Sequence, residues 1–218
     1  MIQDVDAALR TLMRREALNG ADVEVAFDAP TRDWATRRNA PTVDLYLYDI
    51  REDLQRREVS WLPARDETGL VTDRRPPVRL YKLSYLVTAW TQRPEDEHRL
   101  LSAVLAYFIR HERLPDDVLV GSLAAGELPV FTTIALPPPA ERSLSDVWSA
   151  LGGELKPSLD LVVTAPLTDT RRQAVGPPVL EEPRIAMAAT GSGDGAAETV
   201  RAGSEARPGR TIRLRAKR

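Results

Sequence analysis

The spacing of hydrophobic and polar residues in the first fifty positions changes from a helical to an extended period. Over residues 2–18, apolar side chains recur every three or four positions, which predicts an amphipathic helix. Residues 22–27 and 42–50 alternate with a period of two, which is typical of strands. The second of these segments is bulky on both faces, so we expect it inside a sheet. Its expected faces are Val43, Leu45 and Leu47 on one side and Tyr46, Tyr48 and Ile50 on the other.

The same two periods continue through the second half of the chain. Three further strands are predicted, at residues 78–91, 130–136 and 159–167. Two helices are predicted at 94–112 and 143–153, with a short helix near Pro115. Residues 28–41 are expected to form a loop. Strands and helices in this order predict an α+β fold, with a mixed or mainly antiparallel sheet and helices packed on it.

Residues 51–77 differ from their surroundings. They are highly charged and contain Gly69 and three prolines, and we interpret them as an extended hairpin or long arm. Trp61, between Val59 and Leu62, indicates that this arm packs against something. A single compact domain is therefore expected over residues 1–168, with the arm as part of it.

The segment 169–218 lacks hydrophobic periodicity and is predicted to be a flexible tail. From Arg171 onward it carries ten Lys or Arg against five Asp or Glu, whereas the whole chain has a net charge of −2. The body is therefore acidic, which argues against nucleic acid as a main partner. The final stretch, TIRLRAKR, alternates; a solvated end and a strand that adds to a partner sheet both remain open.

Composition limits the chemistry and the location of the protein. The chain has no cysteine, which excludes disulfides and thiolate metal sites. No apolar run approaches the ~20 residues that a membrane-spanning helix needs, so we expect no direct membrane insertion. The first residues show no export signal, and a cytoplasmic location is expected.

The cluster PEDEH, residues 94–98, invites a catalytic or metal-binding interpretation. A helix start already explains it, because Pro94 suits a first turn and the helix dipole favours acids there. Glu95 and Arg99 are spaced for a surface pair. The second histidine, His111, follows His98 by thirteen residues, about 20 Å along a helix. Nucleotide-binding and nucleophile-elbow motifs are also absent, so we expect no enzyme, no cofactor and no metal.

Paired arginines and the apolar residues of the arm are the remaining candidates for function. Arginine pairs in loops suit bridges to acidic neighbours in an assembly. The candidate subunit-interface residues are Arg56, Arg57, Trp61, Leu62, Arg74, Arg75, Arg171 and Arg172.

Several segments together resemble a known family. They are MIQDVDAALRTLMRREAL, APTVDLYLYDIRED, RLYKLSYLVTAWTQRPEDEHRLLSAVLAYF, PVFTTIAL and DVWSALGGELKPSLDLVVTAPL. In this order they resemble the small tail-terminator, or cap, proteins of phage-like contractile injection systems. The resemblance covers about residues 1–168, and the tail lies outside it.

The resemblance implies a structural function. Such a protein forms a hexameric ring on the distal end of the inner tube, stops tube and sheath polymerisation, and joins the sheath to the tube. The implied partners are other copies of the chain, the inner-tube protein and the sheath protein, in a particle assembled in the cytoplasm. The alternative is a small non-enzymatic protein-binding module that acts outside such a particle.

Overall fold

The structure is a computed structural model that describes residues 1–19, 22–126, 128–137, 143–169 and 171–176, together with the backbone of 185–186 and 199–200. Met1–Ala174 form one compact unit. In the second unit, Val175–Arg218, two short strands are described: β9, Ile185–Ala186, pairs antiparallel with β10, Thr199–Val200. Apart from these strands and residues 169 and 171–176, the predicted tail lies outside the described residues, TIRLRAKR included.

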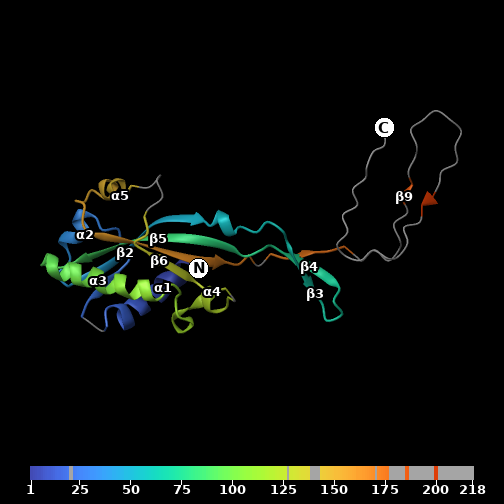
Figure 1. Ribbon diagram of the computed structural model, residues 1–218, viewed down its shortest axis with the longest axis horizontal. Coiled ribbons are helices and arrows are strands. Elements are labelled where there is room, and N and C mark those ends of the chain that lie inside the picture. Colours follow the sequence, from blue (N-terminus) through green and yellow to red (C-terminus); the bar gives the residue numbers. More distant parts are fainter. Residues whose placement is uncertain are drawn as a thin grey trace, which may run out of the picture. The chain divides into compact units, whose positions relative to one another are not determined.

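A five-stranded sheet in the order β1-β2-β5-β7-β6 forms the centre of the first unit (Figure 1). Its strands are β1 Glu24–Ala26, β2 Thr42–Glu52, β5 Arg79–Trp90, β6 Phe131–Ile134 and β7 Ser158–Leu167. β1 runs parallel to β2, and the other neighbours are antiparallel. The α+β prediction with a mixed, mainly antiparallel sheet is confirmed. β2 lies between β1 and β5, as its two bulky faces predicted.

Two helices bury one face of this sheet (Figure 1). α1, Ile2–Leu12, continues into a π-helical turn at Met13–Ala17, and α3 spans Pro94–Arg110. The core joins the apolar stripe of each helix to alternate residues of β2, β5 and β7. Its fully buried members include Leu9, Leu12, Leu45, Tyr85, Val104 and Val163.

The other face of the sheet carries two short helices, one of them within the predicted loop. α5 spans Leu144–Ala150, and α2 spans Arg32–Thr36. α2 begins where Thr31 Oγ1 accepts a hydrogen bond from the Trp34 N–H at 3.3 Å. The Trp34 ring is buried and packs edge to face on Trp90, with ring centroids 5.5 Å apart. The loop prediction was wrong for α2, because five residues are too few to show a helical period.

A β-bulge changes which side chains share a face near the end of β2. Leu47 pairs with Tyr85 and Ile50 pairs with Leu83, while Tyr48 is the extra residue between them. Because Tyr85 and Leu83 lie on one face of β5, Ile50 shares the face of Leu47. The expected grouping of Ile50 with Tyr46 was therefore wrong, since the extra residue shifts the alternation by one position.

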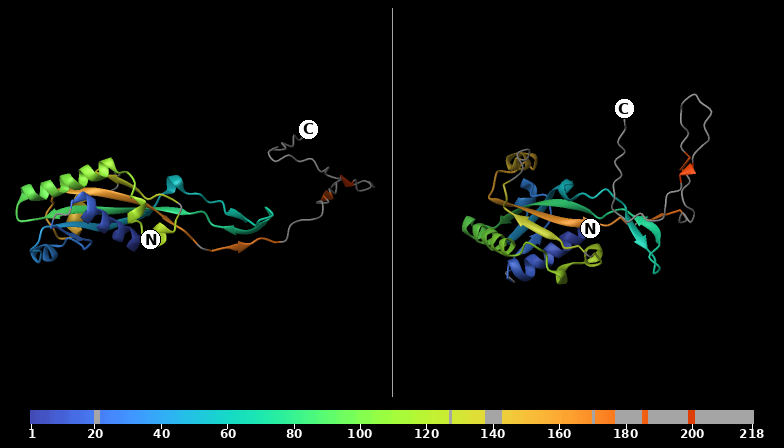
Figure 2. Two further views of the ribbon diagram at one scale, coloured as in Figure 1. Left: turned by 90° about the horizontal axis from the view of Figure 1, so that it is seen from below. Right: turned by 45° about the vertical axis from the view of Figure 1, so that its right-hand side comes forward.

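Residues after β2 leave the sheet as an arm (Figure 2). A 3-10 turn, Leu54–Arg56, precedes the hairpin of β3, Leu62–Arg65, and β4, Val71–Arg75. At the tip, Asp66 accepts hydrogen bonds from the backbone N–H groups of Thr68 and Leu70, at 2.9 and 3.0 Å. A third strand, β8, Gln173–Ala174, pairs with β4. The segment predicted as tail, residues 169–218, thus contributes two residues near its start to the arm sheet.

The remaining described elements close one end of the helical layer. η3, Asp116–Val118, and α4, Gly121–Ala124, follow α3 near the predicted short helix. Asp4 of α1 accepts hydrogen bonds from both the N–H and the hydroxyl of Ser122, at 3.0 and 2.5 Å. Two contacts to one carboxylate therefore fasten α4 to the first helix.

Candidate assembly surface

A buried aspartate anchors the root of the arm. Asp53 follows β2, is 2% exposed, and accepts a 2.7 Å hydrogen bond from Arg56 Nε. Its other carboxylate oxygen lies 3.2 Å from Lys82 Nζ on β5. Burial raises the pKa of Asp53, but the hydrogen bonds from Arg56 and Lys82 outweigh burial and hold that pKa below its ordinary value. The carboxylate is therefore charged at neutral pH and holds the 3-10 turn on the sheet.

The neighbouring acid, Glu52, forms ion pairs with two arginines. Arg79 Nη1 lies 2.9 Å from Glu52 Oε1, and Arg57 Nε lies 3.5 Å from the same atom. Asp53 and Glu52 thus hold Arg56 and Arg57 side by side at the root of the arm. Both arginines remain exposed to solvent. One of the arginine pairs of the sequence, Arg56 and Arg57, therefore lies at the point where the arm meets the body.

Four predicted interface residues line one groove here, of about 760 Å³. They are Arg56, Arg57, Leu62 and Arg75. Between them the groove has apolar walls from distant parts of the chain, namely Val78, Leu80, Leu128 and Pro166. A cationic rim with an apolar floor suits a protein partner that offers acidic and apolar side chains.

Exposed apolar side chains are concentrated along the arm. Among the described residues, six of the thirteen large apolar side chains that are exposed lie within residues 50–70. Val59 is 74% exposed, Leu54 67% and Trp61 40%. Phe131, whose ring lies 5.9 Å from the Arg56 guanidinium carbon, is also exposed beside the root. Exposed apolar side chains gathered in one segment mark a candidate site of protein contact.

The other predicted interface residues lie farther along the arm or outside it. Arg74 pairs with Gln173 of β8 and is exposed. Arg171 lies 2.5 Å from its neighbour Asp169, so this ion pair is local. Arg172 is exposed. The prediction missed Leu54 and Leu128, and only the exposed fraction of their side chains in the folded chain reveals them.

The PEDEH cluster begins α3, as one of its two interpretations predicted. Glu97 accepts from the Thr91 N–H at 3.2 Å and from Lys156 Nζ at 2.7 Å. Arg99 pairs with Asp96 at 2.8 Å and not with Glu95, because the three-residue spacing brings that carboxylate closer. Two of the acids at this helix start, Asp96 and Glu97, thus have structural partners.

The described residues form neither a metal-binding cluster nor a membrane-spanning helix. No group of three or more His, Cys, Asp or Glu side chains in those residues is placed to hold a metal ion. Within the same part of the chain, no helix has both the length and the apolarity required to cross a membrane. His111 instead stacks on Tyr107, with ring centroids 4.3 Å apart.

An α+β body with an anchored arm and a partly apolar groove is typical of a subunit that packs against other chains. The chain belongs to the Pvc16 N-terminal domain family, which matches residues 4–181. The resemblance in the sequence to a family of caps is thereby confirmed.

Two solved structures share this fold. One is the sheath/tube terminator of an extracellular contractile injection system, PVC, in its extended state, with a TM-score of 0.63 and 26% identity over 88% of this chain. The other is the tube-terminating cap of the anti-feeding prophage, AFP, with a TM-score of 0.58 and 26% identity over 83% of this chain. The chain covers 65% and 60% of their lengths, less than two thirds of each. No curated protein matches the sequence significantly.

Proposed function

We propose that this protein is a structural cap of a contractile injection system, which ends the growth of the inner tube and joins the sheath to it. The observation that carries the proposal is the family match over residues 4–181 together with likeness to two terminators. Both solved relatives are described as tube terminators, and one also as a sheath terminator. The sequence resemblance reached the same class from the residues alone.

The cap acts as a ring of identical subunits, six by the family resemblance. A tube grows because each ring offers a surface that the next ring matches, so a terminator must match on one face only. The arm supports this role because its exposed apolar residues and the groove at its root are available to a neighbouring chain. The interface residues in this proposal are Arg56, Arg57, Trp61, Leu62, Arg74 and Arg75, with Arg171 and Arg172 beyond β7.

The role is mechanical and not catalytic, and the partners are the inner-tube and sheath proteins. The particle is assembled in the cytoplasm, where the cap joins the completed tube. Residues 1–168, which include the arm, make most of these contacts, and Arg171 and Arg172 of the basic segment add to them.

Electron microscopy of particles from cells that lack this protein tests the proposal. We expect tubes of irregular length and particles whose sheath is detached or absent at one end, restored by a plasmid copy of the gene. Particles of normal length with an intact terminal layer would contradict it. A short tag on the chain, labelled in isolated particles, then shows whether the protein lies at the terminal layer of the tube.

A further inference from the structure

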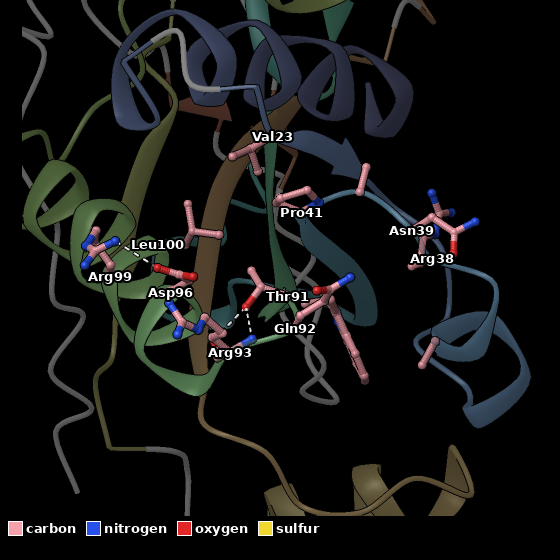
Figure 3. A pocket seen from close by; sticks show the side chains of 13 residues that line it. Val23, Arg38, Asn39, Pro41, Thr91, Gln92, Arg93, Asp96, Arg99 and Leu100 are labelled. Carbon is pink, nitrogen blue, oxygen red and sulfur yellow. Dashed lines mark hydrogen bonds and ion pairs between the residues drawn. The ribbon is translucent and has the colours of Figure 1, made fainter.

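A second groove lies at the opposite end of the sheet from the arm. Its volume is about 570 Å³, and it lies between the end of β5, the start of α3 and the loop after α2. Val23, Pro41 and Leu100 give it an apolar floor (Figure 3). Arg38 stands on one side of this floor, with Arg93 and Arg99 on the other (Figure 3).

The arginines of this groove differ in what they already bind. Arg99 pairs with Asp96 at 2.8 Å, and Arg38 pairs with Glu24 and Asp28, both at 3.0 Å. The exposed Arg93 side chain has no hydrogen bond or ion pair with any residue that the structure describes. The groove therefore offers one uncommitted cation above an apolar floor, which suits a segment with an acid beside an apolar side chain.

The tip of the arm is such a segment. Asp66 is occupied by the turn, where it binds the N–H groups of Thr68 and Leu70. Its neighbour Glu67 is exposed, and in the described part of the chain its carboxylate has no partner. Leu70 is 45% exposed at the same turn. One free acid and one apolar side chain thus project from the hairpin tip.

The geometry of β5 prevents the tip from reaching its own groove. The arm leaves the sheet at Arg79 and the groove begins at Trp90, so the two lie at opposite ends of one strand. The ten steps from Gly69 to Arg79 span about 33 Å when the chain is extended. A compact unit of this length is about 40 Å across. An arm of that reach extends to the adjacent molecule in a ring.

We propose that the hairpin tip of one subunit seats in the groove of a second copy of the chain. Glu67 lies against Arg93 of the neighbour, and Leu70 lies on the floor formed by Val23, Pro41 and Leu100. Such a contact is head to tail, and it closes into a ring when the rotation between neighbours permits. The inference rests on the proposed ring and assigns the two surfaces that close it.

A disulfide between subunits tests the contact directly, because the chain has no cysteine of its own. Thr68→Cys at the tip and Ala40→Cys at the groove, in one chain, are oxidised in the purified protein and in isolated particles. We expect a ladder of covalent oligomers on a denaturing gel, removed by reductant. The matched control combines Thr68→Cys with Thr11→Cys, an exposed position on α1, and should give no ladder. If the Thr68→Cys, Ala40→Cys chain gives no ladder either in the purified protein or in isolated particles, the proposal is wrong.

Mixing two defective chains tests the direction of the contact. Glu67→Lys with Leu70→Asp destroys the tip, and Arg93→Ala removes the free cation of the groove without offering a partner to the lysine introduced at the tip. Each variant alone is expected to remain monomeric in native mass spectrometry. An equal mixture should give a one-to-one dimer and nothing larger, since only one tip and one groove are intact. Rings formed by either variant alone, or no dimer in the mixture, contradict the head-to-tail contact.

The two proposals fail separately. If cells that lack the protein make normal tubes, the cap function is wrong, and the cross-link still decides whether tip and groove meet. The converse outcome is irregular tubes in cells that lack the protein and tubes of normal length when a plasmid supplies the tip variant. If the Thr68→Cys, Ala40→Cys chain then also forms no cross-link, the cap function stands and the tip–groove contact is wrong.

Discussion

Lys82 and Asp53 join the central strand of the sheet to the root of the arm, with Nζ 3.2 Å from Oδ1. The Asp53 N–H also donates to the Leu80 carbonyl at 2.8 Å, so backbone and side chain hold the same turn. A long arm is useful for assembly only if its direction is defined, and this relationship defines it at the point of departure.

Removal of the Asp53 carboxylate should loosen the arm more than it destabilises the body. Asp53→Ala leaves Arg56 and Lys82 without their buried partner, but both are partly exposed and regain water. We expect a loss of about 1–2 kcal/mol of unfolding free energy by urea titration, with faster amide exchange over residues 54–76. Glu58→Ala, which removes an exposed acid of the same arm, is the control. Equal exchange in both variants would exclude the anchor.

Acid should weaken the same anchor. The folded pKa of Asp53 lies below its ordinary value, so the native state binds fewer protons than the unfolded state as the pH falls. The contribution of Asp53 is therefore complete above pH ~4, the ordinary aspartate pKa, and is lost as the pH falls through the folded value. The unfolding free energies of wild type and Asp53→Ala should converge in acid. A constant difference between pH 7 and pH 3 would contradict this.

Asp44 should have the opposite pH dependence. Its side chain is fully buried in β2, and burial raises its pKa to about 7 despite a hydrogen bond from the Asp28 N–H. Between pH ~4 and 7 the unfolded state loses this proton and the native state keeps it, so stability falls as the pH rises. Such a shift corresponds to roughly 4 kcal/mol.

Asp44→Asn should remove that loss. The amide keeps an oxygen for the Asp28 N–H and cannot ionise. We expect the variant to be more stable than wild type at pH 8, and the advantage to shrink as the pH falls toward 4. Urea midpoints of both proteins at three pH values measure this. A stability difference between the two proteins that does not change between pH 4 and pH 8 would contradict the raised pKa of Asp44.

Gly121 should tolerate no side chain. Its φ is +56°, and a Cβ there would lie 2.6 Å from the Asp4 carboxylate that binds Ser122. Gly152 has a similar φ of +66° with open space around it. Both Ala variants have the cost of the left-handed backbone, about 1 kcal/mol. Only Gly121→Ala also displaces Asp4, and we expect its thermal midpoint to fall further; equal midpoints would contradict the close approach.

Replacing the arm should abolish the ring and leave the body folded. Asp53 lies opposite Leu80, so an Asn-Gly turn joining them in place of residues 54–79 continues the hairpin of β2 and β5. The core of α1, α3 and the sheet is untouched by this change. We expect a far-ultraviolet spectrum of a folded α+β protein and a monomeric mass. A ring of normal size would show that the arm makes no essential contact.

Hydrophobic periodicity by itself determined the long elements of this protein. α1, α3, β2 and β5 each span enough positions for a period to emerge, and a period states which face is buried. The helix start at Pro94 was equally local, because proline and the helix dipole act within one turn. The family resemblance rested on these same long segments.

Tertiary structure decided what depends on residues far apart in the chain. α2 is held by Trp34 on Trp90, 56 positions later, and β8 joins the arm from 98 positions after β4 ends. The bulge at Tyr48 is a property of pairing with β5, so no pattern within β2 shows it. The groove of Arg56, Arg57, Leu62 and Arg75 exists because Leu128 and Pro166 are brought beside them. A sequence specifies such neighbours only through the complete fold, because side-chain period carries no information on distance between segments.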